Sequence, residues 1–314
     1  MSKMKVLVTG GAGYIGSVLV GRLLEEGHEV TVIDNFRFDQ SALLRYCADP
    51  SFEVVKADVR DAEVVLPLVK KADAIMPLAG LVGAPICARD PVGARTINFE
   101  AVKLIIDHRS REQRVIFPST NSGYGIGEDG IYCTEETPLR PISLYGQLKV
   151  EMEKLILDQD NVVTFRFATV FGVSPRMRIG LIVNDFTYRA VKDRFIVLYE
   201  PHFKRNYLHV RDAAEAFIHT LNNFETMKNR PYNVGLSDAN ISKLELCQEI
   251  KKIVNDFHIA VSEFSKDPDQ RNYIVSNQRI EATGFKPKVS LQMGIREMVK
   301  AYEMIAANEY MVMR

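Results

Sequence analysis

Short apolar runs alternate with longer amphipathic segments through the first half of the chain. The short runs are rich in Val and Ile and have no polar face, which is typical of strands buried on both sides. The longer segments repeat their apolar positions with a helical period. The predicted strands cover 5–8, 30–33, 53–55, 74–78, 115–117 and 162–167, and the predicted helices cover 14–26, 62–70, 92–108 and 143–158.

This alternation predicts an α/β fold, a Rossmann-type doubly wound parallel sheet with helices on both faces. After Gly172 the pattern becomes irregular, which indicates a smaller α+β C-terminal substrate lobe. Helices are expected there at 183–192, 212–222, 243–257 and 291–307, with strands at 195–198 and 207–210. The expected boundaries are 1–172 plus about 207–236 for the sheet domain, and 173–206 and 237–314 for the lobe.

The length of 314 residues fits about two domains. A hydrophobic content of 46% supports a substantial core and excludes a disordered or disulfide-built chain. The 40 Lys and Arg residues balance the 40 Asp and Glu residues, so the chain has no long-range attraction for nucleic acid or for an anionic membrane. An anionic ligand must therefore be held by a few placed groups.

The N-terminus, Met1-Ser-Lys-Met-Lys5, has no apolar signal segment, and no uncharged apolar run reaches the roughly 18 residues that span a membrane. These features predict a soluble, cytoplasmic protein. The four cysteines are too far apart for a metal knuckle or a redox pair, so we expect buried free thiols and no metal site. They are Cys47, Cys87, Cys133 and Cys247.

A glycine-rich loop, Thr9-Gly-Gly-Ala-Gly-Tyr-Ile-Gly16, follows the first predicted strand. It contains G-x-G-x-x-G at positions 11, 13 and 16, and G-x-x-G-x-x-G at 10, 13 and 16. Such glycines permit a tight turn and close approach to a pyrophosphate, while the next helix supplies amide hydrogens. Because a strand precedes the loop and a helix follows it, the loop predicts a dinucleotide site.

An acid, Asp34, ends the second predicted strand, 21 residues after Gly13. A carboxylate at this place binds the adenosine ribose hydroxyls and repels a 2′-phosphate, which favours NAD over NADP. Arg37 could partly offset that repulsion. Asp58 and Val59, after the third strand, are either adenine contacts or an ordinary solvated strand end, and the sequence favours neither interpretation.

Tyr145 and Lys149 lie four residues apart on one predicted helix, so their side chains share a helix face. A phenol with a reference pKa near ~10 becomes a useful base only when a nearby cation stabilises its phenolate. The same spacing occurs at Tyr188 and Lys192, in the second lobe. Thr120, after the fifth predicted strand, places a hydroxyl at the same sheet edge as Tyr145, which favours the first pair.

Together these features resemble the extended short-chain dehydrogenase/reductase superfamily, in its branch of NAD-dependent nucleotide-sugar epimerases and dehydratases. The likeness covers nearly the whole chain, including Arg166–Gly172 and Arg205–Asp212, which is similar to the R-D-[FY]-[IV]-x-V-x-D segment of that branch. The resemblance implies tightly bound NAD+/NADH, a nucleotide-diphosphate sugar as substrate, no metal, and a homodimer formed by the helices that begin near Val92 and Ser143.

The resemblance also implies roles for single residues. Tyr145 as phenolate removes the proton of a sugar hydroxyl, Thr120 hydrogen-bonds the same oxygen, and Lys149 lowers the tyrosine pKa and holds the nicotinamide ribose. Arg205 and Arg271 either bind the diphosphate as fork-shaped donors or are solvated surface charges. The expected cofactor contacts are Gly10, Gly13, Tyr14, Ile15, Gly16, Asp34, Asn35, Asp58, Val59, Leu78, Ala79, Asn98, Tyr145 and Lys149. The expected substrate contacts are Thr120, Asn121, Ser122, Arg176, Arg178, Arg205 and Arg271.

Two substitutions narrow the expected reaction. The dehydratases of this branch place Asp-Glu after the catalytic Thr, whereas this chain has Asn121 and Ser122, neither of which is a base at neutral pH. Members that epimerise next to a ketone place a Cys where Ser122 stands. Redox chemistry at one sugar carbon, most often C4, remains.

The substrate is less constrained. The chain departs from the family at Met76, Thr169 and the stretch 199–204, in segments that touch the sugar nucleotide. The common family substrate UDP-glucose therefore cannot simply be assigned to this chain. The runs 120–127 and 168–178 resemble bacterial GDP-heptose 4-dehydrogenases of surface-polysaccharide synthesis, a group in which Arg176 and Arg178 would be substrate contacts instead of a basic start to the next helix. We therefore expect a C4 dehydrogenase or 4-epimerase, with a UDP-hexose 4-epimerase or a non-catalytic NAD-binding sensor or scaffold as alternatives.

Overall fold

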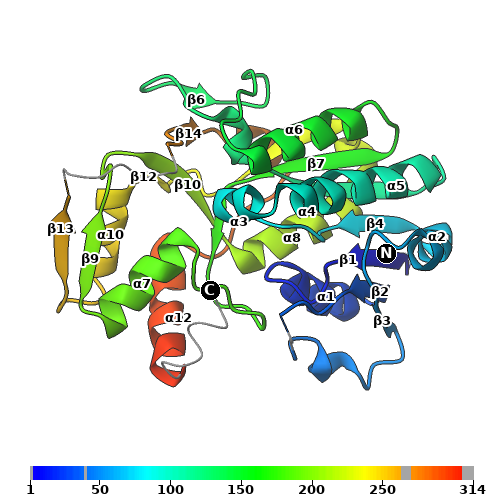
Figure 1. Cartoon of the computed structure of the whole chain (residues 1–314), viewed down its shortest axis with the longest axis horizontal. Helices are drawn as coiled ribbons and strands as arrows, with labels where there is room; N and C mark the ends of the chain where they lie inside the picture. The colour runs from blue at the N-terminus through cyan, green and yellow to red at the C-terminus, as the bar shows by residue number, and fades with distance from the viewer. Residues whose placement is uncertain (1–2, 39–40, 263–269, 306–314) are drawn as a thin grey trace.

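A computed structural model of the chain describes residues 3–38, 41–262 and 270–305. Its largest element is a seven-stranded sheet in the order β11-β7-β5-β4-β1-β2-β3, in which every pair is parallel (Figure 1). The predicted doubly wound α/β fold is confirmed. The strands are β1 (Lys5–Thr9), β2 (Glu29–Asp34), β3 (Phe52–Lys56), β4 (Ala74–Pro77), β5 (Arg114–Thr120), β7 (Val162–Phe167) and β11 (Arg230–Val234).

Alternate residues of the central strands face two separate apolar layers. Val6 and Val8 of β1 pack with α1 (Gly16–Glu25) and α8 (Val210–Asn222), whereas Leu7 packs into the layer on the other face. All three side chains are buried, which explains why the strand sequences have no polar face. Three helices cover the second face (Figure 1): α2 (Ala62–Lys71), α5 (Ala101–His108) and α6 (Leu144–Leu157).

A π-helical turn interrupts the helix predicted over 92–108. The segment α4 (Pro91–Arg95) leads into the π turn η2 (Thr96–Glu100), which continues as α5. The turn carries Asn98, whose side chain is buried. One inserted residue of this kind does not disturb the apolar period enough to be recognised in the sequence.

The second lobe has its own apolar core, enclosed by α7 (Ile182–Lys192), α10 (Lys243–Lys251) and α12 (Leu291–Met304) (Figure 1). Tyr188 lies in this core, with its ring edge-on to Tyr302 at 5.4 Å. Small sheets pair β10 with both β8 and β12, β9 with β13, and β6 with β14. Their bounds are β6 (Tyr132–Cys133), β8 (Thr169–Phe171), β9 (Phe195–Leu198), β10 (Lys204–His209), β12 (Asn240–Ser242), β13 (His258–Val261) and β14 (Ile274–Val275).

The strand predicted at 207–210 lies outside the large sheet. It belongs to β10, which pairs parallel with β8 and antiparallel with β12, while the chain returns to the large sheet at β11. The helix predicted over 243–257 ends earlier, at Lys251, and residues 306–307 of the last predicted helix lie outside the described residues. The remaining short elements are η1 (Leu44–Tyr46), α3 (Ala84–Arg89), η3 (Asn121–Tyr124), α9 (Phe224–Met227) and α11 (Gln278–Glu281).

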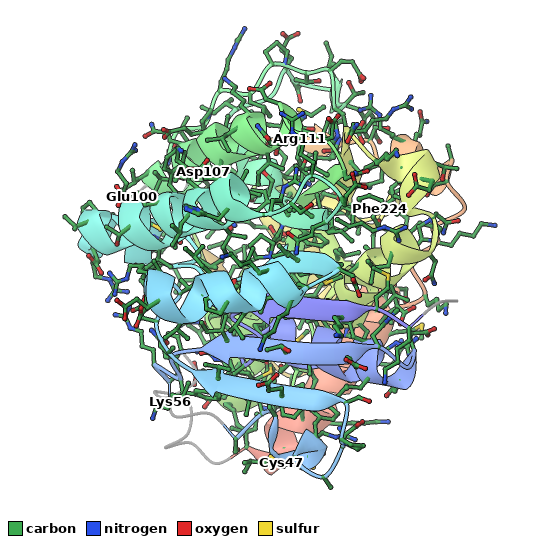
Figure 2. All side chains as sticks on the ribbon, turned by 90° about the vertical axis from the view of Figure 1, so that its right-hand side faces the viewer. Cys47, Lys56, Glu100, Asp107, Arg111 and Phe224 are labelled. Carbon is green, nitrogen blue, oxygen red and sulfur yellow. The ribbon has the colours of Figure 1, made fainter. Side chains whose placement is uncertain are left out.

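The cysteines are free, as predicted, and Cys87, Cys133 and Cys247 are buried. Cys47 is exposed, so the predicted burial is wrong for this thiol, which follows η1 near the β3 edge of the sheet (Figure 2). Within the described ranges, no cluster of three His, Cys, Asp or Glu side chains could hold a metal ion. In the same ranges, no helix combines the length and apolar character needed to cross a membrane.

A buried ion pair fixes α6 against the sheet. Arg166 of β7 donates from Nε to Glu153 Oε1 at 2.8 Å, and the two side chains are only 6% and 2% exposed. Nη1 of Arg166 also donates to the Tyr124 hydroxyl at 3.1 Å and to the Glu135 carbonyl at 3.0 Å. The Tyr124 hydroxyl in turn donates to Asn233 Oδ1 at 2.6 Å. One network therefore joins β7, α6, β11 and the turn that follows β5.

Replacing Glu153 with glutamine would leave the Arg166 charge buried without its carboxylate. We expect Glu153→Gln to lower the free energy of unfolding by roughly 3 kcal/mol. Glu151→Gln on the same helix removes only an exposed contact with Arg95 at 3.4 Å and should cost less than about 1 kcal/mol. Urea unfolding measures both variants, and equal losses would contradict an anchoring role for the buried pair.

Candidate active site

The carboxyl ends of β1 and β4 meet where the strand order reverses, which is where ligands bind in open α/β sheets. Gly10 follows β1 with a φ of +69°, and a Cβ there would lie 2.6 Å from the Ala79 nitrogen. A Cβ on Gly13 or Gly16 would lie 3.0 Å or 2.5 Å from the Gly10 carbonyl oxygen, and Ile15 packs into the sheet core. The loop is therefore a backbone cradle at the start of α1, as a pyrophosphate site requires.

Asp34 ends β2 beside this cradle. Its Oδ2 accepts a hydrogen bond from the Ala12 amide at 3.0 Å, and its Oδ1 accepts one from the Phe36 amide at 2.8 Å. Burial raises the pKa of the carboxyl, and the two amides act in the opposite direction. The glycine loop itself thus orients the carboxylate that is predicted to bind the adenosine ribose.

The predicted adenine contacts are engaged within their own loops. Asp58 Oδ2 accepts from Arg60 Nη2 at 2.7 Å, and the hydrogen bond from Arg60 lowers the Asp58 pKa. Val59 beside it is buried. Asn35 is exposed, and its Oδ1 accepts from the Arg37 amide at 3.0 Å. Contacts of these residues with a nucleotide stay a prediction.

The loop after β4 is fixed by hydrogen bonds from both sides. The amides of Leu78 and Ala79 donate to the carbonyl and hydroxyl oxygens of Thr9 at 3.0 and 3.2 Å. Asn98, in the π turn, accepts from the Leu81 amide at 2.7 Å and donates to the Leu81 carbonyl at 2.8 Å. Asn98 therefore supports the loop that faces the cradle.

Tyr145 and Lys149 occupy the first two turns of α6. Ser143 caps this helix as expected, since its Oγ accepts from the amide three residues later at 3.2 Å. Lys149 Nζ donates to the Pro118 carbonyl at 2.8 Å and lies 4.5 Å from the centre of the Phe117 ring. Burial lowers the Lys149 pKa to about 8, so the ammonium stays largely charged at neutral pH.

Charged and polar groups from four other segments act on Tyr145. Burial is the largest influence and raises the Tyr145 pKa to about 12. The positive charges of Arg178 and Arg271 oppose this rise, as does a hydrogen bond with Thr120, whereas Cys87 adds to it. The structure therefore brings Thr120 and two arginines, Arg178 and Arg271, close enough to act on one phenol.

The residues after β5 connect this phenol to Arg271. Thr120 Oγ1 donates to Ser122 Oγ at 3.0 Å, and Nη1 of Arg271 donates to the same oxygen. Both polar atoms of the Asn121 side chain are buried and have no hydrogen-bond partner among the described residues. Arg205 is buried in β10, where its Nη1 donates to the preceding carbonyl at 2.9 Å. Arg271 thus belongs to the Thr120 side of the site.

Two predicted substrate arginines separate within the β8–α7 loop, residues 172–181. Arg178 reaches the first lobe, where its Nη2 donates to the Val82 carbonyl at 2.6 Å. The Arg176 amide donates to Ser17 Oγ of α1 at 3.4 Å, and its guanidinium lies 4.6 Å from the centre of the Phe38 ring. Arg178 therefore lies on the Tyr145 side, and Arg176 lies on the side of the glycine loop.

Three residues that the sequence patterns did not single out join the β8–α7 loop to both lobes: Ser17, Ser174 and Asn184. The Tyr14 hydroxyl donates to the Gly172 carbonyl at 2.6 Å, and Ser174 Oγ donates to the Tyr14 carbonyl at 2.7 Å. Ser17 and Ser174 share a hydrogen bond of 3.0 Å, and Asn184 Nδ2 donates to the Tyr14 hydroxyl at 3.2 Å. For Asn184 the sequence offered one signal, a polar side chain on the buried face of the helix predicted over 183–192.

Known proteins are similar to this chain over most of its length. UDP-glucuronic acid decarboxylase 6 of Arabidopsis thaliana is 28% identical, with 96% of this chain and 90% of that protein covered. UDP-glucose 4-epimerase of Lactobacillus helveticus is 29% identical, with 80% and 82% covered. The structure of the Thermus thermophilus UDP-glucose 4-epimerase in complex with NAD is 26% identical and superimposes with a TM-score of 0.81, covering 96% of this chain and 99% of that one.

The family comparison covers the glycine cradle and the residues Thr120, Tyr145 and Lys149. Residues 6–235 match the model of the NAD dependent epimerase/dehydratase family, a span that runs from β1 to the end of β11. The expected family is thereby confirmed, and this chain belongs to the NAD-dependent epimerase/dehydratase family.

Proposed function

We propose that this chain is an NAD-dependent enzyme that oxidises C4 of a nucleoside-diphosphate sugar. It then either returns the hydride to the opposite face, as a 4-epimerase, or releases the 4-keto sugar, as a 4-dehydrogenase. The observation that carries the proposal is the hydrogen bond between Thr120, at the end of β5, and Tyr145 on α6, the helix that also carries Lys149. Relatives named as UDP-glucose 4-epimerase and UDP-glucuronic acid decarboxylase support a nucleotide sugar as substrate.

In this reaction Tyr145, as phenolate, accepts the proton of the C4 hydroxyl while Thr120 Oγ1 hydrogen-bonds the same oxygen. Bound NAD would supply the acceptor for the hydride that leaves C4, so the carbinol would become a carbonyl. Lys149, held on the Pro118 carbonyl, contributes positive charge that favours the phenolate. When the hydride returns, Tyr145 donates its proton back to the C4 oxygen.

Ser122 weighs against an elimination reaction. Its hydroxyl accepts hydrogen bonds from Thr120 and Arg271, and a serine so placed is no proton acceptor at neutral pH. Loss of CO2 is a different matter, because a sugar carboxylate that lies β to a C4 ketone can leave without a further base. A uronic acid therefore belongs among the substrates to be tested.

The identity of the sugar nucleotide rests on two short runs. Residues 120–127 and 168–178 resemble GDP-heptose 4-dehydrogenases of surface-polysaccharide synthesis, and we retain a GDP-heptose as one proposed substrate, in a cytoplasmic enzyme. The curated relatives described above carry the names of UDP-sugar enzymes, which makes a UDP-hexose the second proposed substrate.

Tyr145→Phe tests the proposed base. We expect kcat to fall by about 10²- to 10⁴-fold, because the phenyl ring cannot accept the C4 hydroxyl proton. Tyr188→Phe is the matched control, since Tyr188 has the same spacing to a lysine but lies in the core of the second lobe. Products from UDP-glucose, UDP-glucuronic acid, dTDP-glucose and a GDP-heptose would be identified by NMR and mass spectrometry. Absence of any epimer, keto sugar or decarboxylated sugar would favour the non-catalytic sensor or scaffold.

Gly10→Ala tests the cofactor cradle, in which the three glycines would hold the NAD pyrophosphate and Asp34 the adenosine ribose. The new Cβ would meet the backbone of Ala79, so we expect NAD affinity to fall at least tenfold, or about 1.4 kcal/mol. Gly27→Ala is matched in backbone strain, with φ of +83°, but its Cβ would meet nothing within 4 Å. Isothermal titration should show unchanged NAD binding for the control, and equal losses would contradict the cradle.

We also propose a homodimer, formed through α4, η2 and α6. These segments pack side by side on one face of the large sheet (Figure 1). A groove there is lined by five apolar residues, Phe99, Leu139, Pro141, Val150 and Leu155, and by four polar ones, Gln147, Glu151, Lys154 and Asp158. Val92 on α4 is 75% exposed in the single chain, and covering such surface would stabilise an association of two copies.

Val92→Glu tests this surface. Light scattering should give twice the chain mass for the unaltered protein and a shift towards the single-chain mass for the variant, because a charge would have to be buried. Val261→Glu on β13, where the valine is 50% exposed in the other lobe, should leave the mass unchanged. A single-chain mass for the unaltered protein would refute the dimer.

A further inference from the structure

Arg178 crosses from the second lobe to the first. Its backbone belongs to the β8–α7 loop, whereas its Nη2 donates to the carbonyl of Val82 at 2.6 Å. Val82 directly precedes the turn into α3, and α3 packs against α6, which carries Tyr145 in its first turn. The guanidinium is therefore held at the side of the site on which the phenol lies.

We propose that Arg178 is a positioning residue whose charge stabilises the Tyr145 phenolate, and that Asn184 holds Arg178 in place. The inference rests on the proposed role of Tyr145 as the base. It adds a second cation to the one that the family resemblance assigns, Lys149, and it gives Arg178 a role toward the protein's own phenol instead of toward the sugar.

Asn184 is suited to this role because its side chain directs its hydrogen bonds to the β8–α7 loop and to Tyr14, where the loop meets α7. The side chain is fully buried; Nδ2 donates to the Arg178 carbonyl at 2.9 Å and to the Tyr14 hydroxyl at 3.2 Å. Its Oδ1 accepts from the Gly172 amide at 3.0 Å, and its carbonyl accepts from the Tyr302 hydroxyl at 3.0 Å. Asn184 thereby ties Gly172, at the start of the β8–α7 loop, and Arg178, further along it, to α7. The hydrogen bond to the Arg178 carbonyl holds the backbone of Arg178 in place.

The other groups that face Tyr145 leave Arg178 as the strongest opposing charge. Cys87 on α3 has a pKa raised by burial, so it carries no charge at neutral pH. Arg271 directs Nη1 to the Ser122 hydroxyl, and Lys149, on the same helix as the phenol, directs its ammonium to the Pro118 carbonyl. Arg178 acts most strongly of these to lower the Tyr145 pKa, against the rise that burial causes. An arginine is suited to the task because it stays protonated even when partly buried.

The same junction connects Arg178 to the glycine loop. Tyr14, inside that loop, shares Asn184 with Arg178 and also donates to the Gly172 carbonyl. Ser174 bonds both the Tyr14 carbonyl and Ser17 of α1. Displacement of the glycine loop would therefore move the backbone that carries Arg178, which couples the cofactor cradle to the ionisation of the base.

The experiment titrates Tyr145 without turnover. The NAD⁺-bound holoprotein, with no sugar present, is titrated by its near-ultraviolet phenolate absorbance, and the same titration of Tyr145→Phe is subtracted to remove the other 11 of the 12 tyrosines. In Arg178→Met the midpoint should move to higher pH by about 1 unit, because a neighbouring positive charge is lost. Arg178→Lys should return it towards the unaltered value.

Asn184→Leu should raise the midpoint in the same direction, since Arg178 loses its backbone anchor. Thr187→Val is the matched control: Thr187 is also fully buried, one turn further along α7, and donates only within that helix, to the Val183 carbonyl at 2.7 Å. Thermal melting of each variant shows whether it is folded, and Arg178→Met, at a partly exposed position, tests the inference even if Asn184→Leu does not fold.

An unchanged midpoint in Arg178→Met overturns the inference. A midpoint that moves equally in Thr187→Val and Asn184→Leu overturns the part of Asn184. The proposed function fails separately: if no nucleotide sugar is turned over but Arg178→Met still shifts the Tyr145 titration, the electrostatic role of Arg178 stands. Turnover of a nucleotide sugar together with an unshifted Tyr145 titration in Arg178→Met would support the proposed function and overturn the electrostatic role of Arg178.

Discussion

The buried ion pair between Arg166 and Glu153 is the interaction on which the geometry of the site depends. Glu153 lies two turns beyond Tyr145 on α6, and Arg166 also bonds Tyr124, in the turn that follows Thr120. A buried guanidinium must have its donors satisfied, so β7, α6 and this turn are held in one arrangement. The hydrogen bond between Thr120 and Tyr145 is a consequence, because the two residues come from elements that this network joins.

The sheet and the residues at its carboxyl edge could be predicted because both depend on local patterns. Asp34 and Thr120 are the last residues of their strands, and parallel strands bring such residues to one edge. Tyr145 and Lys149 share a helix face because they are four residues apart. The pair Tyr188 and Lys192 has the same spacing, so the order of strands and helices along the chain was needed to separate a site from a core helix.

The arginines could not be placed in this way. Arg176 and Arg178 are two residues apart in a loop without a period, yet one lies over Phe38 and the other reaches Val82. Arg271 meets Ser122 across 149 residues of sequence. Such contacts depend on how the second lobe packs on the first, which no pattern of apolar positions encodes. The π turn in the helix predicted over 92–108 was not predicted for a related reason, because one extra residue leaves the apolar face of the helix nearly intact.

The charges around Tyr145 limit the chemistry that the site can perform. In the described part of the chain, the groups that act on its pKa are two arginines, a thiol and a threonine hydroxyl, and none of them is a carboxylate. Ser122 is itself a hydrogen-bond acceptor for Arg271. None of these groups supplies the carboxylate base that an elimination would need, which suits oxidation at a single hydroxyl through the phenol. The zero net charge of the chain thus conceals a locally positive site, in which two arginines oppose the rise in the Tyr145 pKa that burial causes.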